Sequence, residues 1–138
     1  MRFLLALAAL AFLLAGCSGD DPDVSKLEEG LWVLNSARDV PLPAGVVPTA
    51  GFHDGTVRGS TGCNQYSAPY TVDGDALDIG AVTSTLMACP SPRDTVEQGY
   101  VAALGLAAGW DIDGDELVLS DGAGDELLRY NQARTGDI

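Results

Sequence analysis

Short runs of alternating apolar and polar residues fill most of the chain, a pattern typical of half-buried β-strands. The dipeptide Asp-Gly stands between such runs at Asp54-Gly55, Asp73-Gly74, Asp113-Gly114 and Asp121-Gly122. Type I′ hairpin turns need positive φ at both central positions, and Asp-Gly suits them. Because hairpins join antiparallel neighbours, the pattern predicts an antiparallel sheet.

The flanks of these dipeptides supply the predicted strands. Leu77 and Ile79 fall on one face of a strand because they are two residues apart. The predicted strand segments are Leu31-Trp32-Val33-Leu34, Thr71-Val72, Leu77-Asp78-Ile79, Trp110-Asp111-Ile112, Leu117-Val118-Leu119 and Leu127-Leu128.

One segment has the spacing of a helix instead. Ser91 offers a capping hydroxyl, Pro92 suits the first helical position and Asp94 places an acid in the first turn. Gly109 fits a C-terminal stop. The apolar stripe comprises Val96, Tyr100, Ala103, Leu104 and Ala107. We therefore expect a helix over about residues 92–108, laid against the sheet. The predicted fold class is mainly β (α+β): a small, antiparallel, barrel-like sheet of hairpins with one packed α-helix.

The first residues have the order of a secretory signal. Arg2 precedes an apolar run over residues 3–14, and Leu14-Ala15-Gly16-Cys17 follows, which resembles the lipobox of bacterial lipoproteins. In that family Cys17 would receive a diacylglyceryl group and become the new N-terminus. The alternatives are a plain signal peptide and a transmembrane anchor. The run is about 12 residues long, whereas a spanning helix needs about 20.

These features divide the chain into four segments. Residues 1–16 are a lipoprotein signal peptide, 17–26 a flexible acidic tether, 27–132 the folded domain and 133–138 a frayed tail. Removal of residues 1–16 from the 138-residue chain leaves 122 residues, the size of one small domain. The expected location is outside the cytoplasm of a bacterium, lipid-anchored to the cell membrane or the outer membrane.

The charge balance narrows the class of partner. Without Arg2, 6 basic residues face 20 acidic residues, for a net charge near −14. Nucleic-acid binding is not expected, because it needs a basic footprint. Docking on anionic lipid is also unexpected, so attachment to a membrane rests on the acyl anchor. We interpret the acidity as a soluble, mutually repelling surface, and the alternative is an acidic recognition site for a basic partner.

Two cysteines remain after Cys17. An even pair in an exported domain is usually a disulfide, so Cys63 and Cys89 are expected to be bonded. Closing a loop of about 27 residues contributes roughly 3–4 kcal/mol in the chain-entropy model. The alternatives are free thiols and a metal or redox site. The chain has no Cys-x-x-Cys, and its one histidine, His53, lacks ligand partners in sequence.

The same region resembles the META domain family, which includes the heat-shock lipoprotein HslJ. The most specific matches are Gly62-Cys63-Asn64 and Thr85-Leu86-Met87-Ala88-Cys89. The remaining matching residues are Trp32 within Gly30-Leu31-Trp32-Val33-Leu34, then Phe52, Gly59, Tyr70, Glu97, Tyr100, Leu104, Leu117 and Leu119. The resemblance covers roughly residues 27–130. It implies a compact barrel-like sheet with one helix, and a cell-envelope role linked to stress or antibiotic tolerance.

The resemblance brings no known catalytic residues, and the motif has structural explanations. Asn64 is expected to bond its own loop, and Met87 to fill a gap in the core. We therefore predict a non-enzymatic protein without a cofactor or metal, which binds an unknown envelope protein or small ligand. One version of this hypothesis places an apolar ligand in the mouth of the barrel.

The competing class is a small envelope hydrolase that uses carboxylates or His53. His53 lies beside the predicted Asp54-Gly55 turn, where solvation is expected. The acidic run from Asp111 to Glu116 has some features of a calcium loop, but it lacks the spacing and distal glutamate of an EF-hand. A hairpin turn with acids facing water explains it better.

Overall fold

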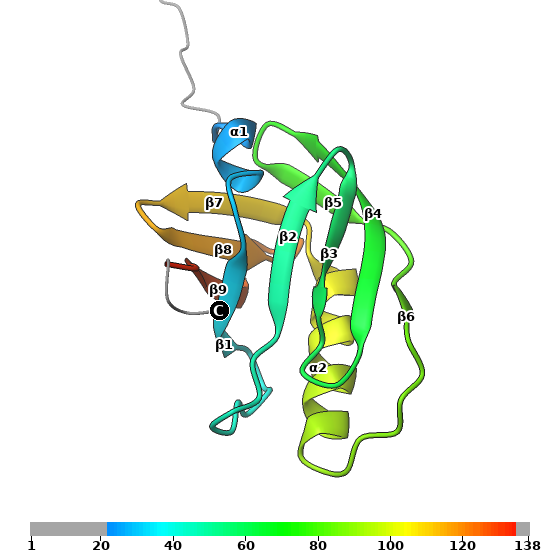
Figure 1. Cartoon of the computed structure of the whole chain (residues 1–138). Coiled ribbons are helices and arrows are strands. Elements are labelled where there is room, and N and C mark those ends of the chain that lie inside the picture. Colours follow the sequence, from blue (N-terminus) through cyan, green and yellow to red (C-terminus); the bar gives the residue numbers. More distant parts are fainter. Residues whose placement is uncertain (1–21, 135–138) are drawn as a thin grey trace, which may run out of the picture.

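Eight strands close into an antiparallel barrel in the computed structural model, which describes residues 22–134 (Figure 1). The order around the barrel is β3-β2-β1-β9-β8-β7-β5-β4, and pairing of β3 with β4 closes it. The short strand β6 pairs with β4 at Tyr66 and Ser67, whereas β5 pairs with β4 from Tyr70 to Asp73. The strands are β1 (Trp32–Ala37), β2 (Thr49–His53), β3 (Thr56–Ser60), β4 (Gln65–Asp73), β5 (Ala76–Ile79), β6 (Thr83–Ser84), β7 (Gly109–Asp113), β8 (Glu116–Ser120) and β9 (Glu126–Gln132). The predicted antiparallel barrel with one packed helix is confirmed.

All four Asp-Gly dipeptides lie where strands reverse, but only one forms the predicted turn. Asp54 and Gly55 both have positive φ, 47° and 74°, between β2 and β3. In the β4–β5 and β7–β8 hairpins the aspartates still belong to the strands. Gly74 (φ 58°) and Gly114 (φ 61°) instead take the first central position of the turn. The expectation of Asp-Gly at the turn centre is wrong there, because one positive-φ glycine in first position is enough, as in type II′ turns.

The fourth dipeptide begins a longer loop between β8 and β9. The Asp121 Oδ1 atom accepts hydrogen bonds from the backbone N–H groups of Ala123 (2.9 Å) and Asp125 (3.0 Å). Gly124, rather than Gly122, has the positive φ of 85°. The carboxylate of Asp121 thus organises the reversal as an Asx-type turn.

The long helix α2 (Arg93–Leu106) follows the predicted stripe, but its ends differ from the prediction. Pro92 is the N-cap residue, and no side chain caps the helix, so the proposed capping role of Ser91 is wrong. The last turn gives way to an extended Ala107, and Gly109 opens β7. Position 109 favours glycine because strand β8 lies close to it. A Cβ there would lie 2.8 Å from the Ser120 Oγ atom.

A hydrogen-bonded tyrosine cluster joins α2 to the barrel wall. The Tyr100 hydroxyl lies 3.0 Å from that of Tyr66 on β4, 2.9 Å from that of Tyr130 on β9 and 3.2 Å from the Thr49 carbonyl oxygen. Burial raises the pKa of all three phenols well above the usual range, so they stay neutral. With Trp32 and Phe52, these rings pack in the interior of the barrel.

A single helical turn, α1 (Val24–Leu27), covers the other end of the barrel (Figure 1). Asp23 caps it through a 3.0 Å hydrogen bond from the Ser25 N–H, and Leu27 is fully buried. The end of the range assigned to the tether is therefore helical. Residues 1–21 and 135–138 lie outside the described residues, and they include the predicted signal peptide, Cys17, the start of the predicted tether and most of the predicted tail. Within residues 22–134, no helix has the length and apolar composition needed to cross a bilayer.

Tyr70 on β4 links the residue after α1 to the barrel at this end. Its hydroxyl donates a 2.7 Å hydrogen bond to the Glu28 carboxylate, and its ring meets Phe52 edge-on at 5.1 Å. Burial and the neighbouring Glu28 charge raise the pKa of Tyr70 to about 12. The phenol is therefore neutral in the physiological range, and the contact is a structural hydrogen bond.

Candidate functional site

An apolar loop projects from the barrel at the end opposite α1. It follows β6 and comprises residues 85–89, which we call the display loop. Leu86 is 95% exposed and Met87 is 63% exposed. The prediction that Met87 fills the core is wrong. Adjacent large apolar residues left in water on one loop are unusual enough to need an explanation.

The side chain of Asn64 holds the backbone of this loop. Its Oδ1 atom accepts hydrogen bonds from the Met87 N–H (2.8 Å) and the Thr85 hydroxyl (2.9 Å), and its Nδ2 donates to the Met87 carbonyl oxygen (3.2 Å). Asn64 is only 3% exposed. The expectation that this side chain bonds its own loop holds for one contact, from Nδ2 to the Cys63 Sγ atom at 3.4 Å. The other partners of the side chain lie more than twenty residues away. The amide acts as a bidentate clamp on the backbone of Met87.

Glu97 on α2 fixes the amide of Asn64 in turn. One carboxylate oxygen, Oε1, accepts hydrogen bonds from Asn64 Nδ2 and from the hydroxyl of the fully buried Thr61, both at 2.8 Å. Thr61 Oγ1 also accepts from the Asn64 backbone N–H at 2.8 Å. The three residues form a connected network between the β3–β4 loop, α2 and the display loop. Hydrogen bonds to a charged acceptor are the stronger kind.

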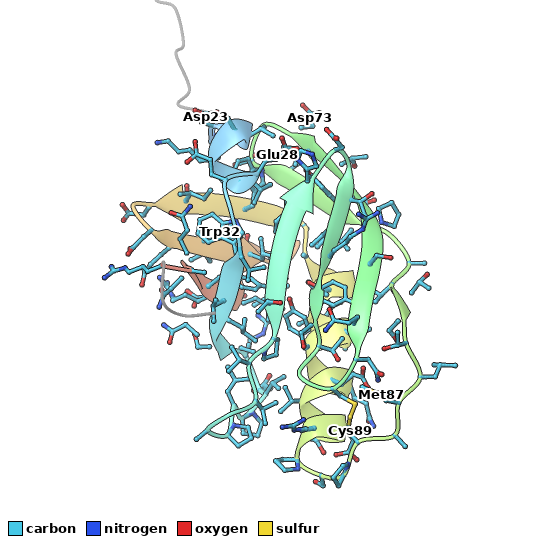
Figure 2. All side chains as sticks on the ribbon, viewed as in Figure 1. Asp23, Glu28, Trp32, Asp73, Met87 and Cys89 are labelled. Carbon is cyan, nitrogen blue, oxygen red and sulfur yellow. A yellow bond between two sulfur atoms is a disulfide. The ribbon has the colours of Figure 1, made fainter. Side chains whose placement is uncertain are left out.

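A disulfide provides the second attachment. Cys63 and Cys89 are bonded, with their Cα atoms 6.0 Å apart, which confirms the predicted pair. Met87 and Cys89 lie beside each other at the far end of the barrel from Asp23 and Glu28 (Figure 2). The loop is thus held on both sides of its apolar tip, by Asn64 at Thr85 and Met87 and by the disulfide at Cys89.

The remaining motif residues shape this region or the opposite end. Gly62 has a φ of +93°, and a Cβ there would lie 2.8 Å from a methyl group of Val46, so a side chain is excluded twice over. Trp32 lies at the α1 end, where its indole N–H donates to the Leu27 carbonyl oxygen at 2.9 Å. The family-motif residues are therefore not one cluster. Gly62, Cys63, Asn64, Thr85, Met87 and Cys89 meet around the display loop, and Trp32 does not.

His53 stands apart from that cluster. Its side chain is 79% exposed, and its Nε2 atom lies 3.1 Å from the Asp54 carboxylate in the β2–β3 turn. The strand β3 runs from that turn to the β3–β4 loop, so its length separates His53 from Asn64. The acidic run between Asp111 and Glu116 is the β7–β8 hairpin. Within residues 22–134, no three His, Cys, Asp or Glu side chains gather closely enough to hold a metal ion.

Two members of the network had no assigned role in the sequence. Glu97 is one of many residues that match the META domain family in sequence. No sequence pattern indicates a role for Thr61. A signal for Glu97 existed, because it stands three residues before Tyr100 and seven before Leu104, on the apolar face of the helix. A charged residue on a buried face needs a buried polar partner.

Solved structures share this architecture. An NMR structure of a protein from Burkholderia xenovorans is 23% identical, with a TM-score of 0.64, and the match covers 98% of this chain and 100% of that chain. A crystal structure of a DUF4847 family protein from Bacteroides vulgatus is 14% identical, with a TM-score of 0.62, covering 82% and 99%. At these identities the likeness shows the fold alone. No curated protein sequence matches the chain.

The barrel, the packed helix and the disulfide beside Asn64 define a class of small closed-barrel domains. Residues 25–134 match the META domain model, and the chain belongs to the META domain family. The family assignment made from the Gly-Cys-Asn and Thr-x-Met-Ala-Cys motifs is confirmed.

Proposed function

We propose that the protein is a membrane-anchored lipoprotein of the bacterial cell envelope, whose META domain acts in stress or antibiotic tolerance by binding rather than by catalysis. The observation that carries the proposal is the display loop. A buried network and a disulfide fix a backbone whose tip, Leu86 and Met87, faces solvent. A loop held rigid before binding loses less conformational entropy when a partner docks.

The motif side chains support binding over catalysis because their polar atoms are already used. Both functional atoms of the Asn64 amide bond the display loop or Glu97, and the thiols of Cys63 and Cys89 are consumed in the disulfide. A catalytic group must instead be free to reach a substrate. We therefore infer that the family motif maintains the shape and position of the display loop.

The proposed lipid anchor would determine how the display loop is oriented relative to the membrane. The lipobox-like Leu14-Ala15-Gly16-Cys17 leads through a few residues to α1, at the end of the barrel opposite the display loop. Fully extended, the six residues from 18 to 23 reach at most about 20 Å. A lipid on Cys17 would hold the α1 end near the bilayer and direct Leu86 and Met87 away from it.

The anchor is tested by Cys17→Ser. We expect the variant to lack the lipid and to escape normal processing, because the thiol that carries the acylglyceryl group is gone. Mass spectrometry of the mature N-terminus reads both effects. An unmodified wild-type protein that begins at any other residue would refute the anchor.

The non-enzymatic claim is tested by His53→Ala. Histidine is the one side chain whose ordinary pKa suits general-base chemistry near neutral pH. Because His53 is exposed in a turn, its removal should leave folding and localisation unchanged. We expect the stress tolerance of a deletion strain to be restored equally by the variant and the wild type. A normally folded, normally localised variant that fails to restore tolerance would favour the hydrolase.

A further inference from the structure

The display loop continues into a groove that contrasts with the acidity of the chain. The groove, of about 390 Å³, lies on the outer face of β3, β4 and β6, and its lining includes Arg58, Gln65, Ser67, Thr83, Ser84 and Thr85. No aspartate or glutamate lines it. A mature chain with a net charge near −14 thus carries, beside its exposed apolar tip, one patch of hydroxyl groups and a cation.

Arg58 is the charged group of this groove. The register places it beside Ser67, which in turn lies beside Thr83, so the three side chains cross the outer face in one row. Arg38, Arg129 and Arg134 each pair with a carboxylate at 2.8–2.9 Å. Arg58 makes no ion pair or side-chain hydrogen bond with any residue between 22 and 134. Its guanidinium is therefore available to a carboxylate from outside the chain.

The edge of β6 adds backbone groups suited to a peptide. Thr85 N–H donates to the Gln65 carbonyl oxygen at 3.0 Å, and Ser84 is paired with Tyr66. In an antiparallel ladder, hydrogen-bonded and non-hydrogen-bonded residues alternate. The N–H and C=O of Ser84 therefore point away from β4, on the side of β6 where no further strand pairs (Figure 1). Open edges of this kind accept extended peptides.

Charge and position argue against two other occupants. A second copy of the chain carries the same charge near −14, so self-association works against electrostatic repulsion. A bilayer with anionic lipids is repelled likewise, and the display loop lies at the end of the barrel opposite α1. A protein segment that is neutral or basic overall meets neither obstacle.

We propose that this groove and the tip of the display loop bind an extended segment of another envelope protein. The segment places one carboxylate on Arg58 and an apolar side chain against Leu86 and Met87, and its main chain bonds Ser84. Its other residues are neutral or basic, because the rest of the surface is acidic. This inference rests on the proposed binding function and names the chemistry of the partner.

The test is a selection of random 12-residue displayed peptides on the mature protein in nonionic detergent. For the wild type, we expect enriched peptides that join one Asp or Glu to an aromatic or aliphatic residue. Arg58→Glu should shift the preferred charge to Lys or Arg. For one selected synthetic peptide, Arg58→Glu or the pair Leu86→Ser and Met87→Ser should weaken the Kd about tenfold or more. Lys26→Glu makes the same charge change on α1 and should leave the Kd unchanged.

The outcomes separate this inference from the function on which it rests. Peptides that depend on Leu86 and Met87 but not on Arg58 would overturn the acidic segment and leave the binding role intact. No enriched peptide, or enrichment that ignores both sites, would overturn the inference. Self-association that ends with the Leu86→Ser and Met87→Ser changes would assign the surface to a second copy. If the binding role itself is wrong, a strain that produces the protein with both Leu86→Ser and Met87→Ser will show full stress tolerance.

Discussion

Asn64→Ala is expected to lower the free energy of unfolding by about 2–4 kcal/mol, a large loss for one polar residue. The substitution removes five side-chain hydrogen bonds: one to the Cys63 sulfur, one to the Thr85 hydroxyl, two to the backbone groups of Met87 and one to Glu97. It also leaves the half-buried Glu97 carboxylate with one fewer hydrogen-bond donor, while the Thr61 hydroxyl still donates to it at 2.8 Å. Unpaired buried groups cost about 1–3 kcal/mol each, which sets the size of the effect.

Chemical denaturation of the wild type and the variant measures this loss. Asn131→Ala is the matched control, because Asn131 is exposed on β9 and should change stability by no more than about 0.5 kcal/mol. Hydrogen exchange adds a local readout, since the Met87 N–H donates to Asn64 and should lose its protection. A variant as stable as the control, with Met87 still protected, would show that Asn64 does not hold the loop.

Loss of the disulfide should be comparably costly. Replacing both Cys63 and Cys89 with serine is expected to destabilise the domain by about 3 kcal/mol, because a link across 26 residues no longer restricts the unfolded chain. A melting curve of each protein, with and without reductant, makes the measurement. Reduction of the wild type should reproduce most of the shift, and the serine variant should not respond to reductant.

The two attachments should also be coupled, since both hold the same short loop. In a double-mutant cycle we expect an interaction free energy of about 0.5–3 kcal/mol between Asn64→Ala and the two serine substitutions. Strict additivity would mean that the network and the disulfide act on independent parts of the structure. Two free thiols in the folded, oxidised wild type would remove the basis of both experiments.

The sequence predicted the hairpins better than their turns. Alternating residues and Asp-Gly dipeptides located four reversals of the chain, because both signals are local. Whether Gly74 or Asp73 takes the turn centre depends on the pairing register, which long-range contacts in the barrel set. The closing β3–β4 hairpin was not predicted at all, since Thr61, Gly62, Cys63 and Asn64 form a loop fixed largely by partners distant in sequence.

The candidate site divides in the same way. The cysteine pair could be predicted, because an even count of cysteines in a domain that is expected to be exported has few alternatives. The roles of Asn64 and Met87 could not, because composition suggests a turn residue for one and a core residue for the other. Only the fold brings Thr85 and Met87 back to Asn64, and so turns Met87 outward.

Restoration of stress tolerance by a variant with Leu86→Ser and Met87→Ser tests the central claim most directly. Both side chains face solvent, so the variant should fold, melt and localise as the wild type does. Val24→Ser, which changes an exposed apolar residue on α1, is the control and should restore tolerance fully. Our account predicts that the doubly substituted protein fails to restore tolerance in the deletion strain. Full restoration by that protein, present in the envelope at the wild-type level, would contradict it.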